Sequence, residues 1–323
     1  MEVPAEKQAT YFLRFLAILL IVNSHLDSLY PIPQLATGGA IGNSLFFMLS
    51  GYGLVLSEQQ RKRPFFEWYG RRILRIYPSL ILAVGVVQFW LAGGWKRWGW
   101  KDYLFSFVWP IDSAWFLAAL VVFYVLFFAF LKIRSSRFYI AFVAGLFIPY
   151  FYFYLRYMDL SRYTIEGPGY FKWLFYFQLM LFGGFLAGRD TEMKTRSCYS
   201  FLALFGSIIM YYFILVMVSK GHGSIQFLVH LLTFPIIYLA IIFSRSSFVL
   251  ETVMSRKYLQ FLITLVAGVT LEIYLLHSLV YSNQFVQSLI FPVNLAVFWV
   301  VTVLISVVLA RVARVAREMF QKV

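Results

Sequence analysis

The sequence predicts an all-α fold, that of a polytopic membrane protein with about ten transmembrane helices. Apolar residues make up 61% of the 323 residues, whereas charged residues make up only 13%. A soluble globular chain usually contains about 25% charged residues. The composition therefore argues against a soluble enzyme, and it excludes a disordered chain, which needs few apolar and many charged residues.

Apolar runs recur along the whole chain, and each has the length of about 20 residues that a helix needs to cross a bilayer. None of them shows the alternation of polar and apolar residues that marks the strands of a membrane barrel. Because no large soluble segment interrupts the runs, we expect residues 1–323 to form a single membrane domain. The predicted spans are residues 10–30, 39–57, 76–94, 115–132, 137–155, 170–188, 199–218, 226–244, 262–282 and 291–310.

Lys and Arg residues gather in every second connection between the predicted spans. Cytoplasmic loops retain an excess of these residues, so we expect most of the 28 Lys and Arg residues on the cytoplasmic side. Both termini then also lie in the cytoplasm, and we expect a multi-pass protein of the inner (plasma) membrane. The net charge of +14 follows from this topology. Membrane lipids, rather than nucleic acid, are therefore the expected partners.

The first predicted span contains the ionisable residues Arg14 and His25. Arg14 and His25 are eleven residues apart, so at about 100° per residue they share one stripe of a helix and are about 16 Å apart along its axis. Burial in the span is expected to keep His25 neutral and able to accept a proton. Two other interpretations stay open: Arg14 extends to the interface from a helix end, or His25 only bonds a neighbouring helix.

Glu272 and His277 lie in the ninth predicted span, where His277 is expected in the outer half, at a depth comparable to that of His25. The two residues differ by about 140° around a helix and so do not share a face. Glu272 is a candidate to pair with Arg14 or with another span, in a catalytic or a purely structural ion pair. The single cysteine, Cys198, excludes a cysteine metal cluster, and we expect no metal site.

Two further segments carry candidate binding residues. Ser50 and Gly51 in the second span allow a neighbouring backbone to approach closely, which simple helix packing also explains. The segment 61–78 is expected to be a cytoplasmic loop that is rich in Arg. Such a loop can anchor the protein to anionic lipid or bind the phosphates of a cytoplasmic ligand through bidentate Arg contacts. The candidate phosphate ligands in this loop are Arg71, Arg72 and Arg75.

Together these residues resemble those of the acyltransferase family 3 membrane proteins, whose members modify surface polysaccharides and other acceptors. The resemblance covers most of the chain and rests on five elements in order. They are Arg14 with His25, Phe46-Phe47-Met48-Leu49-Ser50-Gly51, Arg71-Arg72-Ile73-Leu74-Arg75-Ile76-Tyr77-Pro78, Trp115-Phe116-Leu117, and Tyr274-Leu275-Leu276-His277. The sequence departs from many members at Ser44, where they have an Asp two residues before the Phe pair. Glu272 is a possible substitute for that acid.

The resemblance implies an O-acyltransferase that uses acyl-CoA, expected to be acetyl-CoA, as a cytoplasmic donor. Coenzyme A phosphates would bind Arg14, Arg71, Arg72 and Arg75, with Ser50 close to the donor. His25 would act as general base or acyl carrier, assisted by Arg14, Glu272 and His277, and the acceptor would be a hydroxyl of an extracytoplasmic or lipid-linked glycan. The candidate donors to an oxyanion are Asn23, Ser44, Ser50 and His277.

Two other functions are compatible with part of this pattern. Ionisable residues inside spans also suit a proton-coupled transporter or flippase of a glycan precursor. Such a protein often carries an inverted repeat with broken helices, and the sequence shows no convincing repeat. The unrelated class of membrane O-acyltransferases that works with an Asn and a His has motif surroundings that do not match this chain.

Overall fold

The computed structural model describes residues 4–85, 99–103, 111–132, 136–160, 171–187 and 197–321. These residues form helices joined by short connections, and no strand occurs among them. The predicted all-α fold class is therefore confirmed. Within the same residues, four helical segments are long and apolar enough to cross a membrane on their own, namely Pro33–Gln60, Tyr199–Ser219, Gly223–Ser244 and Val293–Met319. The number of about ten spans and the cytoplasmic termini stay predictions.

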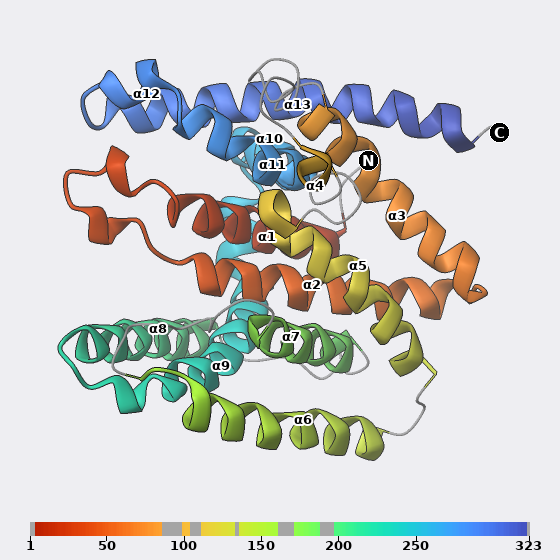
Figure 1. Ribbon diagram of the computed structural model, residues 1–323, viewed down its shortest axis with the longest axis vertical. Helices are drawn as coiled ribbons and strands as arrows, with labels where there is room; N and C mark the ends of the chain where they lie inside the picture. Colours follow the sequence, from red (N-terminus) through yellow and green to blue (C-terminus); the bar gives the residue numbers. More distant parts are fainter. Residues whose placement is uncertain are drawn as a thin grey trace. The chain divides into compact units, whose positions relative to one another are not determined.

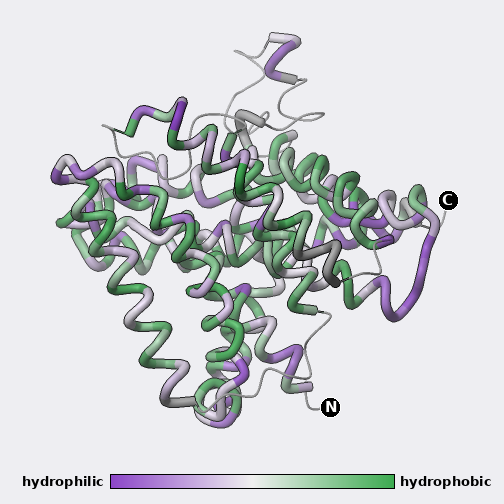
Figure 2. Tube along the Cα trace, turned by 90° about the horizontal axis from the view of Figure 1, so that it is seen from below, coloured by the Kyte–Doolittle hydropathy of each residue, from purple (hydrophilic) through white to green (hydrophobic). Residues whose placement is uncertain are grey.

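The chain folds into two compact units, each built from three stretches of the sequence. Unit 1 contains Met1–Ala17, Ala40–Lys62 and Ala129–Thr264, and unit 2 contains Ile18–Gly39, Arg63–Phe128 and Leu265–Val323. The first helix, α1 (Ala5–Asn23), contributes its first part to unit 1 and its second part to unit 2. Figure 2 shows that much of the helical part of the chain is hydrophobic, as expected for helices that face lipid or each other.

Unit 1 is a set of apolar helices in which glycines allow close packing. Helix α8 packs against α9 and α6 packs against α7 (Figure 1). A Cβ atom at Gly51 of α2 would collide with the Met180 carbonyl of α7, and one at Gly183 of α7 would collide with the Met48 carbonyl of α2. The close backbone approach predicted for Gly51 is therefore observed. Besides the first part of α1, the helices of this unit are α2 (Gly39–Gln60), α6 (Ser136–Tyr157), α7 (Phe171–Ala187), α8 (Ser197–Ser219), α9 (Phe227–Ser244) and the larger part of α10 (Lys257–Gly268), which ends in unit 2.

Unit 2 is organised around α11, which contacts both α3 and the long helix α13 (Figure 1). Helix α13 also packs on α3, so the three helices support one another. Two short 3-10 turns, η1 (Asp27–Leu29) and η2 (Pro33–Leu35), follow the end of α1. The other helices of this unit are α3 (Phe65–Ile81), α4 (Trp100–Tyr103), α5 (Ile111–Phe130, which ends in unit 1), α11 (Thr270–Tyr281), α12 (Gln284–Ser288) and α13 (Val293–Gln321).

The segment 61–78 is not the loop that its charge predicted, because most of it belongs to α3. Pro64 precedes the first turn, where a missing backbone N–H costs nothing, and Glu67 lies in that turn. The Glu67 carboxylate is 3.2 Å from Arg63 Nε and 3.3 Å from Arg71 Nε, both four residues away. Such pairs stabilise a helix. The apolar residues follow a helical period and bury Trp68 and Ile76, a pattern that the many Arg residues concealed.

Two of the predicted spans also differ in their extent. The predicted ninth span is broken into α10 and α11, which meet at an angle of 80°. Val269, between them, has φ −121° and ψ 24°, outside the helical region. The first span was predicted to continue to residue 30, but α1 ends at Asn23. The third predicted span, 76–94, lies partly outside the described residues.

Candidate active site

His25 lies two residues after the end of α1, on a turn that the Asn23 side chain holds in place. Asn23 Nδ2 donates to the carbonyl oxygens of Leu35 at 2.8 Å and Thr37 at 3.0 Å. Asn23 Oδ1 accepts a hydrogen bond from the Tyr30 hydroxyl at 2.6 Å. An amide nitrogen has two protons, and both are committed to the backbone. Asn23 therefore fixes the connection after α1, and the prediction that it donates to an oxyanion is wrong.

The imidazole rings of His25 and His277 are in contact, with 5.1 Å between their centroids and 40° between their planes. His277 comes from α11 and is buried, whereas the His25 side chain is exposed. The expected burial of His25 is therefore wrong, because α1 ends before this residue. The structure nevertheless brings together the two histidines that the sequence suggested at comparable depth.

The hydrogen bond of His277 defines which of its ring nitrogens is free. His277 Nδ1 lies 2.7 Å from the Tyr274 carbonyl oxygen, one turn earlier on α11. A carbonyl oxygen can only accept a hydrogen bond, so Nδ1 carries the proton. In the neutral ring, Nε2 then has a lone pair and can accept a proton. The pair thus joins an exposed imidazole to a buried imidazole whose orientation is fixed.

Glu272 has a partner on another predicted span. Ser79 Oγ of α3 donates to Glu272 Oε1 at 2.6 Å, and both side chains are buried. A hydrogen bond to a charged acceptor is shorter and stronger than one between neutral groups. The contact fixes α11, and with it His277, against the helix that carries the cluster of Arg residues. Glu272 therefore has a structural partner in unit 2, and its catalytic role stays a prediction.

A second contact between the same two segments follows the His25–His277 pair. Tyr281, four residues after His277 on α11, donates its hydroxyl proton to Asp27 Oδ1 at 2.7 Å. This hydrogen bond is the main cause that lowers the pKa of Asp27, and the Ser28 backbone and the charge of His25 act in the same direction. The sequence analysis did not single out Asp27 or Tyr281, because no local pattern connects two residues that are 254 positions apart.

The Arg residues of α3 have two kinds of environment: some are exposed to solvent, and one packs against an aromatic ring. Arg71 and Arg75 are exposed, and their spacing of four residues puts them on one face of the helix. The Arg72 guanidinium lies over the Trp68 ring, 5.3 Å from its centroid. Arg71 and Arg75 are therefore the residues of this helix that a phosphate could reach, whereas Arg72 packs against an aromatic ring.

The other predicted site residues belong to unit 1. Arg14 lies on α1 and Ser50 on α2, and both are partly buried. Ser44 is buried, and its hydroxyl donates to the Ala40 carbonyl of its own helix at 2.6 Å. This bond uses the Ser44 proton within its own helix, and the role of Ser44 as an oxyanion donor stays a prediction. Within the described residues, no group of three or more His, Cys, Asp or Glu side chains could hold a metal ion.

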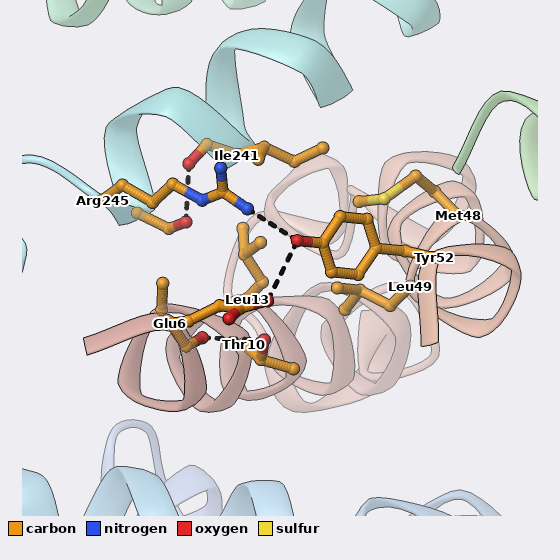
Figure 3. A pocket seen from close by; sticks show the side chains of 10 residues that line it. Glu6, Thr10, Leu13, Met48, Leu49, Tyr52, Ile241 and Arg245 are labelled. Carbon is orange, nitrogen blue, oxygen red and sulfur yellow. Dashed lines mark hydrogen bonds between the residues drawn. The ribbon is translucent and has the colours of Figure 1, made fainter. Parts of the chain in front are cut away.

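Unit 1 also contains a small, mostly apolar cavity between α1, α2 and the end of α9, with a few polar side chains in its lining (Figure 3). Arg245 Nη2 donates to the Tyr52 hydroxyl at 2.9 Å, and this hydroxyl donates to Glu6 Oε1 at 3.2 Å. The cavity volume is about 10 Å³, which is room for about one water molecule. The cavity is too small for a substrate. The hydrogen bonds beside it connect three segments of unit 1.

The protein is an integral membrane protein, as its helical fold and apolar composition indicate. It has an accessible histidine, His25, just after the end of a helix. The family model described as an acyltransferase domain, that of acyltransferase family 3, matches residues 12–312. The chain therefore belongs to acyltransferase family 3 and is a membrane acyltransferase. Neither a curated protein nor a solved structure matches the chain.

Proposed function

We propose that this membrane acyltransferase moves an acyl group, expected to be acetyl, from cytoplasmic acyl-CoA to a hydroxyl of an extracytoplasmic or lipid-linked glycan. We further propose that it works in the inner (plasma) membrane. The observation that carries the proposal is the contact between the exposed imidazole of His25 and the buried imidazole of His277, with 5.1 Å between the ring centroids. A hydroxyl is a weak nucleophile until a base removes its proton during attack. An accessible imidazole with a second imidazole beside it supplies such a base.

In direct transfer, a ring nitrogen of His25 removes the proton from the acceptor hydroxyl. The hydroxyl oxygen then bonds to the thioester carbonyl carbon, and the carbon–sulfur bond breaks. The CoA thiolate leaves and takes the proton back from the imidazolium, so the products are an O-acyl ester and free CoA. His277, whose Nε2 can accept a proton, would share the positive charge that develops on His25 during attack.

His25 can also carry the acyl group itself. In that route an imidazole nitrogen attacks the thioester, CoA leaves as the thiolate, and the acyl-imidazole then reacts with the acceptor hydroxyl. The same exposed ring serves both routes, and His277 can support each of them by accepting a hydrogen bond at Nε2. The two routes differ in whether a labelled histidine forms when the acceptor is absent.

Acyl-CoA is a polyanion at its nucleotide end, so its binding needs cations on the cytoplasmic side. The exposed Arg71 and Arg75, which share one face of α3, suit this task because Arg binds phosphate oxygens bidentately. The roles of Arg14, Arg72 and Ser50 in binding the donor stay predictions from the sequence. Glu272 supports the reaction by holding α11 through Ser79.

The proposal is tested with purified protein in liposomes that receive acetyl-CoA labelled in the acetyl group, together with extracted envelope glycans. We expect label on the glycan fraction and an equal release of CoA. His25→Ala should lower this transfer by about 10²- to 10⁴-fold, the usual effect of removing a general base. The control is His222→Ala, which removes another exposed histidine and should leave the transfer rate unchanged.

The same experiment separates the proposal from its main alternative. A proton-coupled transporter or flippase would move a glycan precursor without consuming acetyl-CoA. Equal rates in His25→Ala and the unaltered protein, measured on protein that inserts normally, would contradict the role of His25. Label that appears on the protein before any glycan is added, and that His25→Ala abolishes, would favour the acyl-histidine route.

A further inference from the structure

Four polar side chains surround the end of α11 and the turn that carries His25. Asp27, Ser28 and Gln287 are exposed and Tyr281 is half-buried. We call these four residues the rim cluster. All of them belong to unit 2, Asp27 follows His25 by two residues, and Tyr281 follows His277 by four. The cluster is therefore joined to both imidazoles through short, well-held segments of the chain.

The hydroxyl groups of the rim cluster have fewer protons than there are oxygen atoms placed to accept them. Tyr281 donates its single hydroxyl proton to Asp27 Oδ1 at 2.7 Å. Ser28 Oγ lies 2.8 Å from Tyr281 Oη and also 2.8 Å from Gln287 Oε1, and both of these oxygens are positioned to accept. A serine hydroxyl has one proton and can donate it to only one of the two. One acceptor oxygen of the cluster must therefore take its hydrogen bond from a donor outside the cluster.

The orientation of Gln287 does not relieve this deficit. Its Nε2 donates to the Tyr281 carbonyl oxygen at 2.7 Å, which commits the amide group to the backbone. Exchanging the amide oxygen and nitrogen would place two acceptors against each other, so Oε1 has to face Ser28. The lowered pKa of Asp27 keeps its carboxylate charged, and this carboxylate adds further accepting capacity. The cluster therefore offers oxygen atoms that can accept hydrogen bonds from a ligand.

The chemistry that completes such a cluster is a ligand with O–H groups. A sugar carries several hydroxyls on neighbouring carbons, so one of them can donate to Gln287 or Asp27 while its neighbour approaches His25. A monohydric alcohol cannot fill both positions. Solvent water can supply the missing proton, but it does not orient a second hydroxyl toward the imidazole.

We propose that the rim cluster is the subsite that binds the acyl acceptor, through a hydroxyl next to the one that reacts, and that it selects a polyhydroxylated ring. The inference rests on the proposed acyl transfer to a hydroxyl, and it assigns the recognition of the acceptor to Asp27, Ser28, Tyr281 and Gln287. Gln287 is the most informative residue, because its side chain bonds Ser28 of the cluster and the Tyr281 carbonyl at the end of α11.

The test is binding, measured without turnover. The purified full-length protein in detergent is examined by saturation-transfer NMR with the methyl glycosides of glucose, galactose and mannose. We expect saturation transfer to at least one glycoside. Gln287→Leu should weaken its binding by about 3- to 10-fold, the effect of one neutral hydrogen bond. The matched control is Gln284→Leu, which removes another exposed amide of α12 and should leave binding unchanged.

The outcomes separate this inference from the proposed function. No saturation transfer to any of the three glycosides, or equal binding by Gln287→Leu and the unaltered protein, would overturn the subsite. Binding that persists in His25→Ala and weakens in Gln287→Leu would support it, because the subsite does not need the catalytic ring. Acetyl transfer that depends on His25 but not on Gln287 would leave the acyltransferase proposal intact and remove the rim cluster from it.

Discussion

His230 in unit 1 and the His25–His277 pair in unit 2 are two histidine sites with opposite surroundings. His230 is fully buried, its Nδ1 lies 3.0 Å from the Tyr150 hydroxyl, and its ring packs against Phe175 and Tyr154 at centroid distances of 4.7 and 4.8 Å. His25 is exposed and meets a second imidazole instead. The ring of His230 is thus enclosed by aromatic side chains, whereas the ring of His25 is accessible and lies beside another imidazole.

The polar networks of the two units differ in the same way. In unit 1, Tyr52 bridges a carboxylate and a guanidinium, Glu6 and Arg245, beside a cavity of about 10 Å³. These opposite charges compensate each other, and nothing larger than about one water fits. In unit 2, the rim cluster is open to solvent and has more acceptors than protons. The comparison teaches that the Glu6–Tyr52–Arg245 network connects helices, whereas the rim cluster leaves acceptor oxygens exposed at the surface.

The comparison of the two histidine sites is tested most strongly by replacing His277. His277→Ala removes the second imidazole and should slow labelled acetyl transfer by about 10²-fold, the lower end of the range for acid–base catalysis. His230→Gln, which keeps an acceptor for the Tyr150 hydroxyl, should leave the rate unchanged. Initial rates of CoA release at saturating acetyl-CoA measure both. Similar losses in the two variants would mean that access does not distinguish the two histidine sites.

A smaller effect is expected on stability at the contact between α3 and α11. Ser79→Ala leaves the buried Glu272 carboxylate without its donor, which should cost about 1–3 kcal/mol of the free energy of unfolding. The midpoint of thermal unfolding, followed by circular dichroism in detergent, should fall accordingly. Glu272→Gln, introduced together with Ser79→Ala, removes the buried charge and should recover part of the loss. An unchanged midpoint in Ser79→Ala would show that the bond does not hold α11.

Much of the fold could be predicted from the sequence, because the length of an apolar run is a local property. The predicted spans 137–155, 199–218 and 226–244 correspond to α6, α8 and α9 within a few residues. The bend between α10 and α11 could not be predicted this way, since one non-helical residue, Val269, does not lower the hydropathy of a run. Amphipathic α3 was missed because its charge concealed its helical period.

The site was predictable in its two histidines but not in its contacts. Rare ionisable residues inside apolar runs indicated His25 and His277, and the same rule applies to His230, which was not singled out. The end of α1 depends on bonds from Asn23 to residues more than ten positions later. Likewise, the partner of Glu272 is separated from it by 193 residues. Local pattern contains no information about such partners, so Ser79, Tyr281 and Gln287 appeared only in the structure.

The smallest expected effect is a pH dependence at the rim cluster. The Tyr281 hydroxyl lowers the pKa of Asp27 below its ordinary value of 3.8. A carboxylate with a lowered pKa adds stability above that ordinary value, and the contribution is lost as the pH falls through the lowered pKa. Tyr281→Phe should therefore lower the unfolding midpoint slightly at pH 7, and the difference from the unaltered protein should shrink on acidification below pH 3.8. In an Asp27→Asn background the pH-dependent part of the difference should vanish. A difference that grows on acidification would have the wrong sign for a hydrogen bond to a charged Asp27. The rim cluster of unit 2 would then lack the uncompensated carboxylate that distinguishes it from the Glu6–Tyr52–Arg245 network of unit 1.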